Sequence, residues 1–184
     1  MIISVCGKSG SGKSTISNEL KNIYRDKIIH VEIDKIGHMA LEDDRVKNEI
    51  IQSFGEKLLN DQNIDRKKLG YIVFNSRNEM KKLSCITWNY MESVIDIIID
   101  RNKDRIIVLD YLLLPVTKFF KMSDIRILLD VDYEVRKNRC IIRDNISEEE
   151  FNLREKASID YDKNEFDYVI SSSENVRELV KIYE

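Results

Sequence analysis

The sequence has little of what would tie it to a secreted or membrane setting. Its three cysteines, Cys6, Cys85 and Cys140, are widely spaced and form no C-x-x-C pair, which argues against a disulfide framework or a zinc site and predicts reduced thiols. No apolar run approaches the ~18 residues that a membrane helix needs. The N-terminus has neither a basic segment nor a small-residue cleavage site. We therefore expect a cytoplasmic protein with no membrane partner.

A strong excess of charge of one sign is also missing. The net charge is −3 over 184 residues, and the sequence pI is ≈ 5.6. Nucleic-acid-binding proteins neutralise many phosphates with a basic surface, so this balance argues against them. The length suits a single domain, residues 1–184, and neither repeats nor low-complexity linkers are present. We expect a small-molecule partner, no nucleic acid, and a monomer or weak oligomer.

Glycine is scarce, yet three of the six glycines stand close together near the start of the chain. An apolar run, Ile2 to Val5, leads into G-K-S-G-S-G-K-S over residues 7–14, which matches the P-loop motif G-x-x-x-x-G-K-[ST]. Glycines let successive backbone N–H groups turn inward, and such a nest at a helix N-terminus binds phosphate. The alternative is a Gly/Ser-rich turn that matches by chance, and the preceding strand makes chance less plausible.

The P-loop assigns roles to particular residues. Lys13 should reach the β and γ phosphates of ATP, and the Ser14 hydroxyl should coordinate Mg²⁺. The expected nucleotide-binding residues are Gly7, Gly10, Ser11, Gly12, Lys13, Ser14 and Thr15.

Two acidic residues follow apolar strand patterns. The β-branched run 28–33 closes on Asp34, and the run 105–110 ends in Asp110. The carboxyl ends of parallel strands face the ligand in open α/β sheets. Asp34 is therefore either aimed at the phosphate site or only an N-cap of the next helix. Asp110 resembles a Walker B carboxylate that holds Mg²⁺ directly or through water, the alternative being a terminal Asp that meets solvent.

The remaining pattern alternates strands with helices. Strands are expected at 2–5, 28–33, 105–110, 124–131 and 167–170. Helices are expected over 15–25, 43–54, 65–74 and 78–100, two more are expected to begin at 132 and at 147, and a last one runs from 173 to the C-terminus. Such alternation predicts an α/β fold with a five-stranded parallel sheet and helices on both faces. The apolar stripe of the long helix is expected to be core, comprising Leu83, Ile86, Tyr90, Val94 and Ile97, widened by Met91, Ile95 and Ile98. Trp88 lies off its centre, and either packs or meets a ligand.

A basic face is predicted on the helix that Asp132 caps. Arg136, Arg139 and Arg143 follow one another at i, i+3 and i+7, so they share one side of the helix. Such a face is usually only solvated. In a P-loop kinase, however, a late helical pair with arginines is where a closing lid would lie, and within it we expect Arg136 to be dispensable.

These residues resemble the dephospho-CoA kinase family of P-loop small-molecule kinases. The resemblance runs nearly end to end. It includes the P-loop G-S-G-K-S-T that ends at Thr15, E-I-D at 32–34 where the family usually shows D-x-D, the block from Phe54 to Phe74, the strand R-I-I-V-L-D, and R-C-I-I-R-D at 139–144. The Phe-Gly and Asp-Arg-x-x-Leu elements of the middle block are its specific part.

The resemblance implies a P-loop kinase fold with a helical lid at about 136–160 and an acceptor-binding helical region at about 34–101. It implies ATP-dependent phosphorylation of the ribose 3′-hydroxyl of dephospho-CoA, with Mg²⁺. Asp34 would be the base, and Arg139 and Arg143 would be the lid arginines.

The chain departs from the family pattern in three places. Trp88-Asn89 replaces a His-Pro pair, Leu112 to Leu114 replaces Pro-Leu-Leu, and Ser158 stands for a Gln. These positions bear on the acceptor and the lid, which leaves open a kinase for a nucleoside, a nucleotide or another hydroxyl acceptor. A nucleotide-binding switch is a further alternative, although the sequence lacks the guanine-selecting N-K-x-D motif.

Overall fold

The structure is a computed structural model that describes residues 1–172 and divides into two compact units. The first is formed by Met1–Glu32 together with the chain from Arg101 onward, and the second by Ile33–Asp100. The C-terminal helix that the sequence predicts from residue 173 lies outside the described residues.

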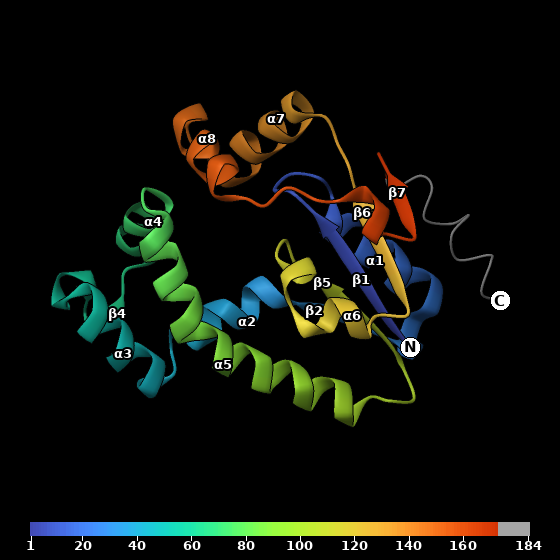
Figure 1. The fold of residues 1–184 in the computed structure, drawn as a ribbon, viewed down its shortest axis with the longest axis horizontal. Helices are drawn as coiled ribbons and strands as arrows, with labels where there is room; N and C mark the ends of the chain where they lie inside the picture. The colour runs from blue at the N-terminus through green and yellow to red at the C-terminus, as the bar shows by residue number, and fades with distance from the viewer. Residues whose placement is uncertain (173–184) are drawn as a thin grey trace. The chain divides into compact units, whose positions relative to one another are not determined.

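A five-stranded parallel sheet forms the centre of the first unit (Figure 1). Its strands are β1 (Ile2–Gly7), β2 (Ile28–Glu32), β5 (Ile106–Asp110), β6 (Ile125–Leu129) and β7 (Tyr168–Ile170). Their order is β2-β5-β1-β6-β7, and all four pairings are parallel. Both the five strands and their direction confirm the sequence-based prediction.

Helices cover both faces of this sheet. On one face α1 (Lys13–Tyr24) buries Ile16 and Leu20 against alternate strand residues such as Val5, and each such side chain contributes about 1.5–3 kcal/mol when fully buried. On the other face lies the short α6 (Lys118–Met122), whose following residue Ser123 bonds the Ser4 hydroxyl of β1 at 2.6 Å. The predicted α/β architecture with helices on both faces is therefore confirmed.

Two further helices follow β6 in the first unit. Asp132 caps α7 (Tyr133–Asp144) through the N–H groups of Glu134 and Val135. A capping box between Ser147 and Glu150 opens α8 (Glu148–Ala157), as the S-x-x-E pattern predicts. Figure 1 shows the two helices side by side, and the rings of Tyr133 and Phe151 join them edge to face at 5.5 Å. Single 3-10 turns complete this unit: Arg25–Lys27, Leu114–Val116, which contains Pro115, and Lys163–Glu165.

The second unit is helical. It comprises α2 (Ile33–Ala40), α3 (Asp44–Phe54), α4 (Arg66–Phe74) and α5 (Arg77–Arg101), with a 3-10 turn at Glu56–Leu58. Asp43 and Asp65 cap α3 and α4 by accepting hydrogen bonds from backbone N–H groups. A short hairpin joins β3 (Leu59–Asn60) to β4 (Asn63–Ile64). Asp61 and Gln62 have positive φ there, as a two-residue hairpin favours.

The buried row of α5 differs from the predicted stripe. Thr87, Met91 and Ile95 are its buried residues, whereas Ile97 is 49% exposed. The i, i+4 spacing of the buried row is helical, but the side that faces the core is set by the helices packed against it. One of these is α2, because a Cβ added at Gly37 would lie 3.5 Å from the Met91 sulfur. Met91 and Ile95 were part of the predicted stripe, so period alone predicted the helix and part of its buried row but included the exposed Ile97 and omitted Thr87.

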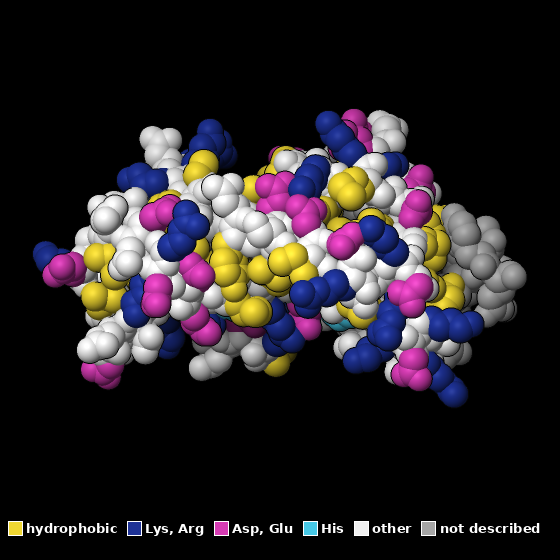
Figure 2. All heavy atoms as spheres, turned by 90° about the horizontal axis from the view of Figure 1, so that it is seen from below, with side chains coloured by type: hydrophobic (Ala, Val, Ile, Leu, Met, Phe, Trp, Pro, Cys, Tyr) yellow, Lys and Arg dark blue, Asp and Glu magenta, His cyan; other side chains and the backbone are white. Residues whose placement is uncertain are grey.

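Two surface findings complete the description. Within residues 1–172, none of the helices combines the length and the apolar character needed to span a membrane. On the face drawn in Figure 2, basic and acidic side chains are interspersed, as the near balance of 30 Lys and Arg with 33 Asp and Glu predicts.

Candidate active site

The phosphate-binding loop joins β1 to α1 and is built from backbone. Gly12 has φ 98° and precedes the first turn of α1, where the N–H groups of Thr15 and Ile16 bond its carbonyl at 3.0 and 3.1 Å. The first N–H groups of a helix have no partner within the helix. Within the described chain no side chain caps α1. Those N–H groups are thus left to a ligand, and they favour an anion.

One buried hydroxyl supports this reading of the loop. Ser11 is only 2% exposed, and its Oγ is the buried side-chain polar atom in residues 1–172 that lacks a hydrogen-bond partner. Buried polar groups are almost always hydrogen-bonded. A Cβ added at Gly7 would lie 2.5 Å from this oxygen, so the loop closes tightly around it. An orphaned donor in a backbone nest fits a site completed by a bound phosphate group.

Lys13 and Ser14 stand at the start of α1, next to the loop. The Lys13 ammonium donates to the Gly7 carbonyl at 3.0 Å and so lies back over the loop. Ser14 and Thr15 are exposed. The structure therefore brings together the P-loop residues that the sequence singled out, with the lysine charge on the loop.

Asp110 ends β5 and faces the helix that carries Ser14. Ser14 Oγ donates to Asp110 Oδ2 at 3.4 Å, and His30 Nε2 lies 3.4 Å from the same oxygen. Asp110 is 4% exposed, so the alternative of a terminal Asp that meets solvent is wrong. A hydroxyl and a carboxylate are the hard oxygen ligands that Mg²⁺ prefers, and the pair fits such an ion. Among residues 1–172 no group of three or more His, Cys, Asp or Glu side chains could hold a metal. A Mg²⁺ ion bound with a nucleotide does not need such a group, because phosphates and water supply most of its ligands.

The three arginines of α7 have different surroundings. Arg139 Nη1 donates to the Gly10 carbonyl of the loop at 3.3 Å. Arg143 forks onto Asp144 at 2.7 and 3.0 Å with a side chain 63% exposed. Hydrogen bonds from Arg143 keep the pKa of the Asp144 carboxyl below its usual range. Arg136 is 6% exposed and pairs with Glu155. Arg136 therefore does not belong to a solvated face, whereas the expectation that it is dispensable for turnover stays a prediction.

Asp34 belongs to the second unit and lies in the first turn of α2, exposed to solvent. It therefore stands inside the helix and not before it, where an N-cap would be, although a carboxylate in a first turn still interacts favourably with the helix dipole. Along the chain it comes two residues after Glu32, the β2 residue that pairs with Asp110 in the sheet.

The positions that depart from the family pattern have ordinary structural partners. Ser158 ends α8 and donates to the Glu155 carbonyl at 2.7 Å. The Leu112 carbonyl accepts from the Tyr161 hydroxyl at 2.8 Å. Trp88 is half-buried on α5.

The sequence reading missed two charged residues near the loop. Lys8, inside the loop, bonds Glu155 of α8 at 3.3 Å and Asp160 at 3.1 Å. Lys8 could have been singled out from the sequence, because it is a lysine at a variable position of the P-loop motif. No local sequence feature marks Glu155. Cys6 and Cys140 are buried, and burial raises the pKa of both thiols, so neither has the low thiol pKa of a reactive cysteine.

Comparisons with known proteins agree with this geometry. The family model described as dephospho-CoA kinase matches residues 1–178. A dephospho-CoA kinase of Fusobacterium nucleatum is 35% identical over 185 residues, which cover 98% of this chain and 94% of that protein. One from Aquifex aeolicus is 33% identical, covering 99% and 95% of the two chains.

A solved structure gives the same result for the fold. The dephospho-CoA kinase from Campylobacter jejuni matches with a TM-score of 0.64 and 25% identity, over 98% of this chain and 94% of that chain. The match thus runs through the P-loop, the strand that ends in Asp110 and the helices α7 and α8. With the family model spanning residues 1–178, the chain belongs to the dephospho-CoA kinase family.

Proposed function

We propose that this protein transfers the γ-phosphoryl group of ATP to the ribose 3′-hydroxyl of dephospho-CoA, giving coenzyme A and ADP. The observation that carries the proposal is the P-loop, with Lys13 and Ser14 opposite the buried Asp110, in a chain that the family model matches over residues 1–178. Phosphoryl transfer needs little covalent chemistry from a protein, because positioning and charge neutralisation provide most of the acceleration.

The loop is the part that handles phosphate. Its N–H groups and the N-terminus of α1 would hold the β and γ phosphates of ATP. Lys13, which now bonds the Gly7 carbonyl at 3.0 Å, would turn its ammonium to these phosphates and offset the charge that builds up during transfer.

Ser14 and Asp110 are the residues that would hold Mg²⁺. Their oxygen atoms and the 3.4 Å distance between them suit a hard cation bound through one or two protein groups. When bound, the ion neutralises phosphate charge.

Asp34 and the α7 arginines would act on the acceptor and the transferring group. Asp34 would orient or deprotonate the acceptor hydroxyl, a role that rests on the family resemblance and on its place just after β2. Arg139 and Arg143 would close over the γ-phosphoryl group, with α7 and α8 serving as the lid. Closure would exclude water, which would otherwise hydrolyse ATP.

A kinase for a different small acceptor is the second candidate. It is favoured by Trp88-Asn89 and Leu112, which stand where the family has other residues. Both candidates use the same phosphate site, so only the acceptor separates them.

An acceptor screen tests the proposal. ADP release would be followed with dephospho-CoA, nucleosides and nucleoside monophosphates at equal concentration. Rapid turnover with dephospho-CoA alone, giving a product with phosphate on the ribose 3′-oxygen, is the expected result. Turnover with a nucleoside or nucleotide and none with dephospho-CoA would select the second candidate, and nucleotide binding without acceptor-dependent turnover would reject both.

A further inference from the structure

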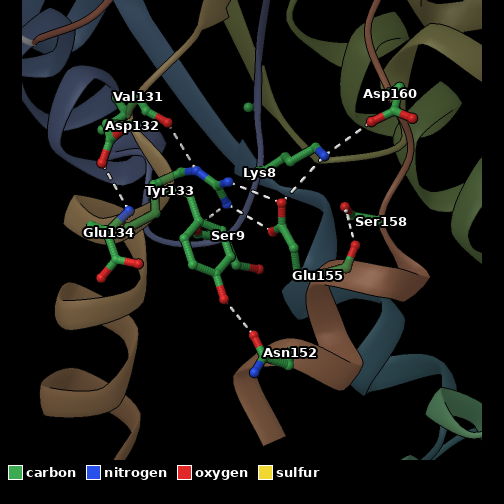
Figure 3. Close-up of polar contacts among 12 residues, drawn as sticks. Lys8, Ser9, Val131, Asp132, Tyr133, Glu134, Asn152, Glu155, Ser158 and Asp160 are labelled. Carbon is green, nitrogen blue, oxygen red and sulfur yellow. Dashed lines mark hydrogen bonds and ion pairs between the residues drawn. The ribbon is translucent and has the colours of Figure 1, made fainter. Parts of the chain in front are cut away.

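The buried guanidinium of Arg136 on α7 bonds both α8 and the phosphate-binding loop. Figure 3 shows the polar cluster that contains its partners Ser9, Val131 and Glu155. Its Nη1 and Nη2 bond the two carboxylate oxygens of Glu155 at 2.8 and 2.9 Å, and its Nε donates to the Val131 carbonyl at 3.0 Å. The planar fork of arginine suits such a two-point contact with a carboxylate, and a lysine ammonium does not. The Glu155 contact raises the pKa of Arg136, and the pKa of Glu155 is correspondingly held below its usual range. Both groups therefore stay charged.

The same guanidinium reaches the loop backbone. Arg136 Nη1 donates to the Ser9 carbonyl at 3.4 Å, and one turn later Arg139 Nη1 donates to the Gly10 carbonyl at 3.3 Å. The C=O and N–H of a trans peptide point in opposite directions, so an anchored Ser9 carbonyl directs the Gly10 N–H away from α7. The next peptide, between Gly10 and Ser11, is fixed at both ends. Arg139 holds its carbonyl, and its N–H bonds the Lys8 carbonyl at 3.1 Å. Two consecutive peptide planes of the loop are thus oriented by α7.

Backbone packing brings α7 close enough for these contacts. Gly10 has φ +79°, and a Cβ added there would lie 2.5 Å from the Arg136 carbonyl oxygen and 2.9 Å from Cys140 Sγ. No side chain other than hydrogen fits between the loop and α7 at this point. The position of the loop is therefore coupled to the position of α7.

Glu155 ties α8 into the same arrangement. Its Oε1 accepts from Arg136 at 2.9 Å and from Lys8 of the loop at 3.3 Å, and Lys8 also bonds Asp160 at 3.1 Å. One carboxylate thus joins a cation of the loop to a cation of α7. Removing one partner from a buried ion pair leaves the other charge uncompensated, whereas removing both is often neutral.

We propose that Arg136, held by Glu155, is a positioning residue of the phosphate-binding loop: it presets the loop peptides in the orientation that binds ATP. The inference rests on the proposed function only in that the loop binds ATP. Preset donors need no reorganisation when the anion arrives, so loss of the pair should weaken nucleotide binding and leave acceptor binding alone.

Two single variants measure the effect. Glu155→Gln keeps the side-chain shape and removes the charge, and Arg136→Lys keeps the charge and removes the fork. Isothermal titration calorimetry with ATP and no acceptor should show a Kd raised about tenfold to a hundredfold, the loss expected when a hydrogen bond to a charged group is weakened. In steady-state assays KM for ATP should rise in parallel, and KM for the acceptor should stay within about twofold of its original value.

The matched control is a second ion pair that joins these two helices. Lys137 of α7 bonds Glu148 of α8 at 3.0 Å and also Glu134. Glu148→Gln and Lys137→Gln should leave the Kd for ATP within about twofold. A Glu155→Gln variant that binds ATP no worse than Glu148→Gln, with an unchanged KM for ATP, would overturn the proposal.

A double variant keeps the test decisive if the single variants unfold. Arg136→Met with Glu155→Leu replaces the buried guanidinium and its partly buried carboxylate partner by apolar groups and should restore much of the thermal stability, while ATP still binds weakly because the Ser9 carbonyl is no longer held. Recovery of stability together with normal ATP affinity would show a purely structural pair. Since the calorimetry uses ATP alone, inactivity toward dephospho-CoA would reject the proposed function and leave this inference standing, whereas wild-type protein that binds no ATP would reject both.

Discussion

Ser14 Oγ lies 3.4 Å from Asp110 Oδ2, so the first turn of α1 and the carboxyl end of β5 bring two side-chain oxygen atoms together. We predict that Asp110→Asn raises the Mg²⁺ concentration needed for half-maximal activity by about tenfold or more, because the amide has lost the charge that attracts the ion. Losses of this size are typical when a group that holds or orients a metal ligand is changed. The measurement is a Mg²⁺ titration of the phosphoryl-transfer rate.

Asp167→Asn provides the control for this prediction. Asp167 accepts a hydrogen bond from the Arg126 N–H at 2.8 Å just before β7, and it carries no proposed metal role. Its Mg²⁺ titration should match that of the wild type. An Asp110→Asn titration that also matches would leave the carboxylate with a structural role beside His30.

Lys13→Ala should reduce turnover by about 10²–10³, the usual cost of removing one preset contact to developing charge. The fold should persist, because the ammonium contacts a loop carbonyl at 3.0 Å and not the core. Lys21→Ala, on the exposed side of the same helix, is the matched control. The experiment compares kcat and the thermal midpoint of the three proteins. A Lys13→Ala enzyme with near-normal kcat would remove the lysine from the mechanism.

Features with a local signal were predictable from the sequence. Four helix starts have an N-cap residue whose side chain accepts a hydrogen bond from a backbone N–H two or three positions later: Asp43, Asp65, Asp132 and Ser147. The P-loop is a contiguous motif. The five strands were equally visible as β-branched runs. In each case the information lies within a few residues of the feature.

Features that depend on packing were not predictable. Arg136 and Arg143 share a predicted helix face, yet one is 6% exposed and the side chain of the other is 63% exposed. The loop contacts α7 near its start, at Gly10 and Arg136, and a helical period carries no information about that. Nor does it reveal Glu155, the partner 19 residues away. The burial of Thr87 and the exposure of Ile97 on α5 have the same origin.

Asp34→Asn should lower turnover by orders of magnitude while the Kd for ATP changes little, since the carboxylate is proposed to act on the acceptor hydroxyl. An amide is nearly isosteric but cannot take the proton. Asp44→Asn is the matched control, because Asp44 is likewise an exposed acid in the first turn of a helix and should show only the small dipole effect of ~0.3–1 kcal/mol on stability. Equal kcat values for the two variants would reduce Asp34 to that dipole role.

Arg143→Lys should cut turnover substantially and shift nucleotide affinity only modestly, and Arg139→Lys should likewise cut turnover. The charge of the transferring phosphoryl group spreads over its equatorial oxygens, and the arginine fork matches that geometry better than an ammonium does. Single-turnover rates and ATP binding would be compared with those of Arg154→Lys. This control alters the 2.8 Å hydrogen bond from Arg154 of α8 to Asp144 of α7. Near-normal rates in Arg143→Lys and Arg139→Lys would show that neither guanidinium acts on the transferring phosphoryl group. Arg143 would then serve only to pair with Asp144.

The Glu155 contacts make a pH-dependent contribution to stability whose sign can be stated. Hydrogen bonds from Arg136, followed by the charges of Arg136 and Lys8, lower the pKa of Glu155 from its usual 4.5, against the opposing effect of burial. A group whose pKa is lower in the folded protein than in the unfolded chain stabilises the fold. This stabilisation is fully present at pH values above the pKa of the unfolded chain, and it is lost as the pH falls through the pKa of the folded protein. The difference in free energy of unfolding between wild type and Glu155→Gln should therefore be largest near pH 7 and shrink below about pH 4.5. Urea unfolding at a series of pH values measures it, with Glu149→Gln, an exposed change at the start of α8, as the reference. A difference that stays constant or grows on acidification would contradict the assignment of Glu155 as the ionised partner of Arg136.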